Sequence, residues 1–241
     1  MSTVGKGLAM QHPSARGTRR GEGRGGADAA LTDVLPALRP PRQSRSEESL
    51  AKMIRVGRDL IEQHGGFESV VISDVIRKAG TSTGAFYGRF KDKDAFIVSV
   101  LNAVFAELRA DVDRWIAEDR VFATGTASDV AGSIVRYYVE MCGENRGMFK
   151  AVLRHFASRD PDANPMRWLD RHIREHVVPL LTGKLRNRRQ PDLALKVEAA
   201  IQMVVGTLVV TLLTDPGPLH FDGDQLEVNL EEMMHRFLQL P

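Results

Sequence analysis

Residues 80–94 read Gly80-Thr81-Ser82-Thr83-Gly84-Ala85-Phe86-Tyr87-Gly88-Arg89-Phe90-Lys91-Asp92-Lys93-Asp94. Within this stretch one helix is expected to end and another to begin, and small residues are followed by aromatic and basic ones. Gly80 suits a left-handed turn at the end of a helix, where a side chain would clash with the backbone. Thr81 or Ser82 suits the N-cap of the next helix. The stretch therefore predicts the turn and second helix of a helix-turn-helix.

The residues upstream predict the first two helices of the same unit. From Leu50 to Ile61, apolar residues recur at spacings of three and four, as on one buried face of a helix. Ser46 and the glutamates after it suit the start of that helix, and Gly65-Gly66 suits its end. A second, short helix is expected over residues 71–79.

The residue types in the third predicted helix favour contact with DNA. A recognition helix contacts bases in the major groove through its N-terminal residues, and small side chains there allow the backbone to approach closely. Phe86 and Phe90 lie four residues apart and should anchor the helix in its own core. Tyr87 and Arg89 are then free to contact the DNA backbone. The predicted DNA-binding residues are Arg45, Ser73, Arg77, Thr81, Ser82, Thr83, Gly84, Ala85, Tyr87, Arg89, Lys91 and Lys93.

A plainer interpretation of the same residues is that Ser, Thr and Gly serve as ordinary helix caps, and that residues 91–94 form a solvated surface. The order of residues 80–93 favours the first interpretation, because it resembles the DNA-binding domain of TetR-type (tetracycline-repressor-type) transcriptional regulators. That family reads roughly Gly-Val-Ser-x-Gly-x-Leu/Phe-Tyr-x-His/Tyr-Phe-x-x-Lys. Gly66-Phe67 and residues 74–80 also fall at the family's spacing, and the resemblance covers about Ser46 to Leu101.

The chain departs from the family pattern at three places. Thr81 replaces the usual Val, and Ile76 replaces a usual Ala. The Thr or Ser expected near Val70-Val71 is missing, which leaves Ser69 or Ser73 to cap the second helix.

Helical patterns continue to the end of the chain, and no period-two strand pattern is found, so we expect an all-α fold. We expect a basic disordered tail over residues 1–44, an N-terminal three-helix DNA-binding domain over 45–101, and a C-terminal helical ligand-binding and dimerisation domain over 102–241. The further helices are predicted over residues 92–118, 127–142, 146–158, 165–188, 191–214 and 224–240. The tail could add non-specific phosphate contacts or could be a simple extension.

Composition limits the class of protein. Residues 1–45 hold eight Lys and Arg against three Asp and Glu, so most of the basic character lies in the tail. A single cysteine, Cys142, excludes an internal disulfide and suits a reducing cytosol. No run approaches the roughly 20 apolar residues of a membrane span, so we expect no membrane partner. For a DNA-binding protein we expect a cytoplasmic, nucleoid-associated location.

The helix predicted over residues 191–214 is apolar on more than one face, and such a helix needs cover on more than one side. In TetR-like proteins the last two helices of each subunit form a four-helix bundle with those of the partner. The resemblance therefore implies a homodimer that binds a palindromic double-stranded DNA operator. Burial within one subunit is the alternative. The family also implies a repressor that a small-molecule effector releases from its operator. Control by a protein partner instead of a ligand is a further alternative.

The middle helices mix aromatic, methionine and polar side chains, as ligand pockets do, although such stripes also occur in ordinary cores. The predicted effector-binding residues are Tyr137, Met141, Met148, Phe149, Val152, His155, Trp168 and His172.

His172 and His176 share a helix face and could bind zinc, and with Glu175 they spell the inverzincin motif His-x-x-Glu-His. No third ligand follows in the sequence, and we therefore predict no metal site. A metalloprotein or enzyme centred on this pair is kept as the alternative. No other catalytic motif is recognised, and we expect neither enzymatic activity nor a cofactor.

Overall fold

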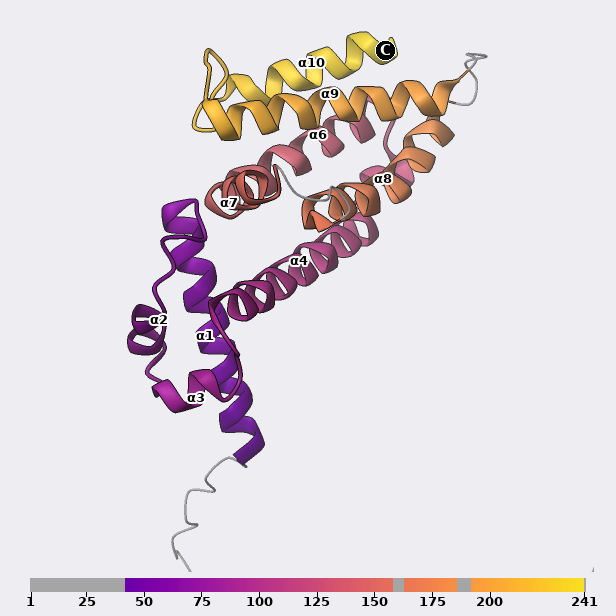
Figure 1. Cartoon of the computed structure of the whole chain (residues 1–241). Helices are drawn as coiled ribbons and strands as arrows, with labels where there is room; N and C mark the ends of the chain where they lie inside the picture. Colours follow the sequence, from indigo (N-terminus) through magenta and orange to yellow (C-terminus); the bar gives the residue numbers. More distant parts are fainter. Residues whose placement is uncertain (1–41, 158–162, 186–191, 241) are drawn as a thin grey trace, which may run out of the picture. The chain divides into compact units, whose positions relative to one another are not determined.

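The computed structural model describes residues 42–157, 163–185 and 192–240, with side chains from residue 46 onward in the first of these ranges. These residues form ten α-helices and no strand, which confirms the predicted all-α class (Figure 1). Residues 40–241 form one compact unit. The predicted tail over residues 1–44 lies outside the described residues, except for its last three.

Those three residues belong to helix α1, which spans Arg42–His64 and begins four residues before the predicted start at Ser46. In the sequence, prolines stand directly before Arg42, and proline is compatible with the first turn of a helix. Gly65 ends α1 with φ of 63°, a left-handed conformation that glycine adopts without steric cost. The predicted end of the helix is therefore confirmed.

Helices α2, Ile72–Ala79, and α3, Thr83–Tyr87, form the predicted helix-turn-helix. Gly80 ends α2 in the left-handed conformation, with φ of 63° and ψ of 37°. The Ser82 hydroxyl caps α3 by accepting a hydrogen bond from the Ala85 amide at 3.1 Å.

The cap predicted for α2 is wrong. Val71 occupies the N-cap position, and no side chain accepts a hydrogen bond there. The Ser69 hydroxyl instead donates to the Gly66 carbonyl at 2.8 Å, which orders the loop before α2, and Ser73 lies inside the helix.

Helix α4, Lys93–Glu118, runs from the helix-turn-helix into the C-terminal region, as the sequence predicts. Asp92 caps it by accepting from the Ala95 amide at 2.8 Å. The buried side chains along α4 run from Phe96 to Val112 and join one hydrophobic core that continues into the later helices. Helix α4 packs against α1 near one end and against α8 near the other (Figure 1).

Six helices follow. They are α5, Val121–Thr124; α6, Ala127–Glu144; α7, Arg146–Phe156; α8, Pro165–Lys184; α9, Leu193–Thr214; and α10, Gln225–Leu238. The sequence did not predict α5, because four residues are too few to show a periodic pattern. Helix α6 continues two residues beyond its predicted end at residue 142, and Asn145 follows it as the C-cap. Predicted helix ends at residues 158, 188 and 191 lie outside the described residues.

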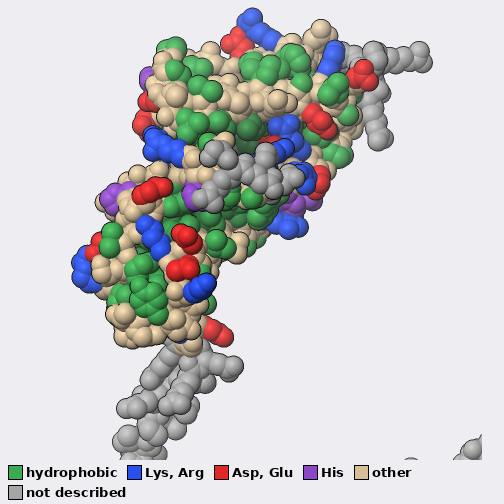
Figure 2. Space-filling model, in the orientation of Figure 1, with side chains coloured by type: hydrophobic (Ala, Val, Ile, Leu, Met, Phe, Trp, Pro, Cys, Tyr) green, Lys and Arg blue, Asp and Glu red, His purple; other side chains and the backbone are tan. Residues whose placement is uncertain are grey.

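Helices α9 and α10 lie together over α6 (Figure 1). By length and composition α9 could cross a membrane, contrary to the expectation from its sequence. Its Val197, Ile201, Val204 and Leu208 side chains are buried against neighbouring helices, as in the core helix of a folded domain. Hydrophobic side chains also gather on the outer surface of this layer in Figure 2.

Helices α1 and α7 approach each other closely at Glu62 and Gly147, a contact called the α1–α7 joint below. The Glu62 carboxylate accepts hydrogen bonds from the amides of Gly147 and Met148, each at 2.8 Å, and so caps the N-terminal turn of α7. A Cβ atom on Gly147 would lie 1.9 Å from the Glu62 carbonyl oxygen, so the two helices can approach this closely only because residue 147 is glycine. Arg58 extends the joint by donating to Glu107 of α4 at 2.7 Å and to Asn145 at 3.2 Å.

Candidate DNA-binding interface and effector cavity

Helix α3 has one face in the core and one face in solvent. Phe86 is fully buried, with its ring centroid 5.0 Å from that of Phe90 and 5.3 Å from that of Phe96. Tyr87 follows directly and is 53% exposed. The Phe cluster therefore fixes the orientation in which α3 presents Tyr87 to solvent.

The N-terminal turn of α3 is open. Ser82, Thr83 and Gly84 are all exposed. A Cβ atom added to Gly84 would meet no other atom within 4 Å, so packing inside the chain does not require glycine there. This turn has room for a partner to approach the backbone.

Two of the predicted basic residues are held by contacts within the chain. The Arg89 guanidinium donates to the Ala85 carbonyl at 2.9 Å and to the Ser46 hydroxyl at 2.8 Å. The Lys93 ammonium donates to the Glu68 carbonyl at 3.0 Å. Both side chains therefore brace α3 and the start of α4 against neighbouring segments.

The other predicted residues surround the same surface. Arg77 is exposed and forms an ion pair with Asp74 at 2.8 Å, and Lys91 is exposed. Ser73 is exposed, while Thr81 and Ala85 are half-buried. The side chain of Arg45 lies outside the described residues.

A cavity of about 170 Å³ lies among α6, α7, α8 and α9. Of the eight predicted effector-binding residues, Met141 and Phe149 line it. The full lining is Tyr138, Met141, Cys142, Phe149, Leu153, Asn164, Met166, Arg167, Leu169, Asp170, Ile173, Val205, Leu208 and Val209.

The other six predicted residues lie elsewhere. Tyr137 stacks on Trp115 with centroids 4.0 Å apart, and Met148 and Val152 are buried in the core. The remaining three contact other side chains: His155 contacts Phe67, Trp168 contacts Phe105, and His172 pairs with Asp113.

Asp170 and Arg174, which were not predicted as site residues, form the polar end of the cavity together with Tyr138. The Tyr138 hydroxyl donates to one Asp170 carboxylate oxygen at 2.9 Å, and Arg174 Nε donates to the other at 2.7 Å. Burial raises the pKa of Tyr138 well above its usual value, and the negative charge of Asp170 acts in the same direction. Burial also raises the pKa of the Cys142 thiol to about 12, so this lining group is a protonated thiol near neutral pH. Asp170 and Arg174 are four residues apart, a helical ion-pair spacing that could have revealed them.

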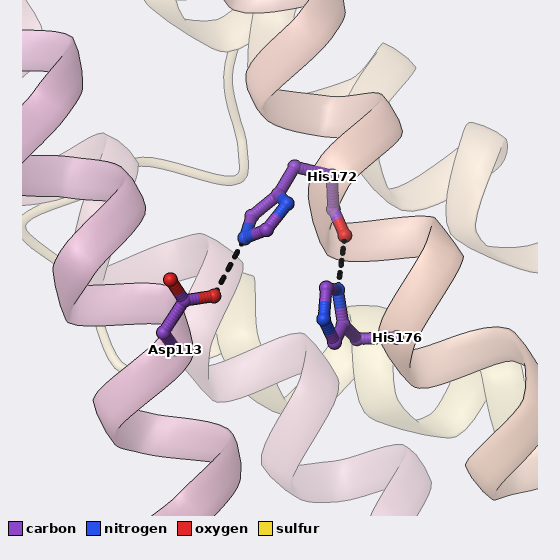
Figure 3. A group of neighbouring side chains, drawn as sticks. All are labelled: Asp113, His172 and His176. Atoms are coloured by element: carbon purple, nitrogen blue, oxygen red, sulfur yellow. Dashed lines mark hydrogen bonds and ion pairs between the residues drawn. The ribbon is translucent and has the colours of Figure 1, made fainter.

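A second polar cluster lies where α4 and α8 meet. Asp113 of α4 points toward His172 of α8, and His176 lies one helical turn farther along α8 (Figure 3). The Asp113 Oδ1 and His172 Nε2 atoms are 2.7 Å apart. The structure thus adds a carboxylate, 59 residues upstream of His172, to the histidine pair seen in the sequence.

Residues 54–100 match the family model of bacterial regulatory proteins of the tetR family. Among solved structures, the chain resembles a protein from Rhodococcus sp. described as a TetR-family transcriptional regulator, with 15% identity, a TM-score of 0.58, and coverage of 79% of this chain and 99% of that chain. It also resembles the transcriptional regulator FadR from Bacillus subtilis in complex with stearoyl-CoA, with 16% identity, a TM-score of 0.52, and coverage of 78% and 97%. GusR from Salmonella enterica gives 15% identity, a TM-score of 0.53, and coverage of 84% and 98%.

At these identities the solved structures show a shared fold. No curated protein sequence matches the chain significantly. The resemblance noted in the sequence and the predicted fold are both confirmed.

Proposed function

Because residues 54–100 match the family model of bacterial regulatory proteins of the tetR family, we propose that this chain is a sequence-specific transcriptional repressor. In this proposal a homodimer binds a palindromic operator, and a small-molecule effector releases it.

The observation that carries the proposal is that α3 has one face buried in the core and the other exposed to solvent. Phe86 anchors the helix in the core, while Thr83, Gly84 and Tyr87 are exposed on a turn with room for a partner. A recognition helix needs this arrangement, because its orientation must be fixed while its outer side chains contact base edges and phosphates. Lys91 and Arg77 supply positive charge beside it for phosphate contacts.

Dimerisation is supported by the outer surface of α9 and α10. Val210 and Leu213 of α9 are exposed, as are Val228 and Phe237 of α10. Large apolar side chains gathered on adjacent helices favour association, since pairing two such surfaces removes them from water. An operator with two half-sites would then match the two-fold symmetry of the dimer.

Ligand release is supported by the cavity among α6 to α9. Its volume of about 170 Å³ suits a small molecule, since an apolar cavity of roughly 150 Å³ holds one benzene ring. The lining is mainly apolar, with Asp170 at a polar end, so the effector class that fits best is a single-ring compound carrying one hydrogen-bonding group.

Release follows by a shift in population between two conformations. An effector that favours one arrangement of α7 and α8 changes their contacts with α1 and α4, which carry the DNA-binding helices. In a dimer, a small change in these contacts alters the spacing of the two recognition helices.

A mobility-shift assay with the chain's own upstream DNA, repeated at several salt concentrations, tests the proposal. We expect a sharp complex that survives competitor DNA. Tyr87→Ala should weaken it at least about tenfold, equivalent to about 1.4 kcal/mol. Arg154→Ala, which removes an exposed charge on α7, is the control and should bind as the wild type does. Diffuse binding that competitor DNA removes, in the wild type and both variants alike, would contradict sequence-specific recognition at this site.

A further inference from the structure

The three side chains in Figure 3 bring together the ligand types of a transition-metal site. Asp113 comes from α4, and His172 and His176 come from α8. One potential ligand atom from each lies within 4.8 Å of the other two. Imidazole and carboxylate are ligands of zinc and of its neighbours among the divalent transition metals.

Hydrogen bonding fixes the tautomer that a metal would need. His176 Nδ1 lies 2.8 Å from the His172 carbonyl oxygen. A carbonyl only accepts, so Nδ1 carries the proton, and Nε2 of the neutral ring keeps its lone pair. Metal-binding histidines commonly have this arrangement, in which the second ring nitrogen donates to a backbone carbonyl.

Small side-chain movements would complete the site. Tetrahedral zinc binds nitrogen and oxygen at about 2.0–2.1 Å, which places its ligands about 3.4 Å apart. The His172 side chain is 13% exposed and is the fixed member, while the Asp113 side chain is 54% exposed and can rotate. In the absence of an ion, His172 Nε2–H donates to the Asp113 carboxylate oxygen Oδ1, 2.7 Å away, and an ion would replace that proton. The site faces solvent, so water can supply the fourth ligand.

The surrounding charges are mixed. Glu175 adds negative charge beside His172, and Arg109 and Arg171 line the same shallow pocket with positive charge. Asp111 and Arg114 pair with each other at 2.8 Å on α4. These five charges sum to +1, which the carboxylate of Asp113 offsets.

We propose that Asp113, His172 and His176 form a surface site for one divalent transition-metal ion of the zinc class, which joins α4 to α8. An ion there would hold α8 against the helix whose other end carries the recognition unit. The regulatory consequence rests on the proposed function, but metal binding itself does not.

The test uses the full chain with any affinity tag removed and metal stripped by a chelator. Zinc binding is measured by calorimetry, and cobalt binding by the visible absorption of tetrahedral cobalt. Asp113→Asn and His176→Gln remove one ligand each at exposed positions, and circular dichroism confirms that they fold. His220→Gln is the matched control, because His220 also faces a carboxylate, Asp215, at 2.7 Å, but belongs to no three-ligand group among the described residues.

We expect one ion per chain in the wild type and in His220→Gln, with affinity at least about tenfold weaker in the two site variants. No stoichiometric binding by the wild type at about 10 μM metal would overturn the proposal, as would equal affinity in wild type and His176→Gln. Since DNA is absent from this experiment, its failure would leave the proposed repressor function untouched, and failure of DNA binding would leave this site untouched.

Discussion

At Gly84, packing within the chain would permit a larger residue, whereas close contact with the proposed DNA partner would favour glycine. Alanine stabilises a helix interior by about 0.5–1 kcal/mol relative to glycine, and nothing in the chain would obstruct an alanine here. A stabilising substitution is therefore available at the first turn of α3. Close approach of DNA to this turn would explain why glycine occupies it.

We therefore expect Gly84→Ala to keep or slightly raise the melting temperature and to weaken operator binding at least about tenfold. The extra methyl group would separate α3 from the groove without disturbing the fold. Thermal unfolding and fluorescence anisotropy with operator DNA provide the two readouts. Gly183→Ala in α8 is the matched control, because a Cβ there also meets nothing within 4 Å. Equal DNA affinity in Gly84→Ala and Gly183→Ala would contradict the assignment of this turn.

Contacts within one helix could be predicted from the sequence, whereas contacts between distant segments could not. It identified Phe86 as an anchor and Tyr87 as exposed, because both follow from helical geometry within α3. It could not show that Arg89 donates to Ser46, 43 residues away, or that Asp113 faces His172 across 59 residues. Such contacts depend on how helices pack, and a single sequence contains no direct signal for them.

At the scale of helices, local signals located most boundaries. Gly65 and Gly80 end their helices because both adopt positive φ. Helix α4 begins after Asp92 because the Asp92 carboxylate caps its first turn. Where the signal was weak, prediction failed: Val71 begins α2 without a capping side chain. The lining of the cavity among α6, α7, α8 and α9 was predicted in part, because its walls come from four helices. Periodicity places a residue on one face of a helix but does not indicate which other helix will cover that face.

The joint between α1 and α7 predicts an effect on stability. In Gly147→Ala, the new Cβ would lie 1.9 Å from the Glu62 carbonyl oxygen, so α1 and α7 must separate. Overpacking of this kind costs roughly 1–3 kcal/mol or more. For a chain of this size, we expect a melting temperature lower by about 3–10 °C, measured by circular dichroism.

Gly143→Ala provides the control for this prediction. Gly143 also lies in a helix near the joint, but a Cβ there makes an ordinary contact with Phe221 at 3.8 Å. Its melting temperature should stay within about 2 °C of the wild type. If the two variants had the same melting temperature, the close approach of α1 and α7 would not be a constraint on the fold.

For the whole molecule, the exposed apolar residues of α9 and α10 form the proposed dimer contact. We expect Val228→Arg to shift the chain from dimer to monomer, because an arginine in a paired apolar surface would be desolvated without a partner. Val98→Arg is the matched control and should remain a dimer. Val98 and Val228 are both 55% exposed, but Val98 lies on α4, outside the proposed dimer contact. Sedimentation velocity at the same protein concentration would compare the two. A dimer that survives both Val228→Arg and Val210→Arg would place the subunit contact elsewhere.

The contact between Glu62 and the first turn of α7 also limits how the chain can be recombined with its relatives. A chimera that joined this DNA-binding half to the C-terminal half of another protein would separate Glu62 from Gly147, and the new partner of Glu62 would need a glycine and two free amides in the same place. The glycine is required by the backbone of residue 62, and the carboxylate binds backbone amides of α7, so the two requirements are separate. Any C-terminal half joined at the predicted domain boundary would have to meet both of them for α7 to pack this closely on α1.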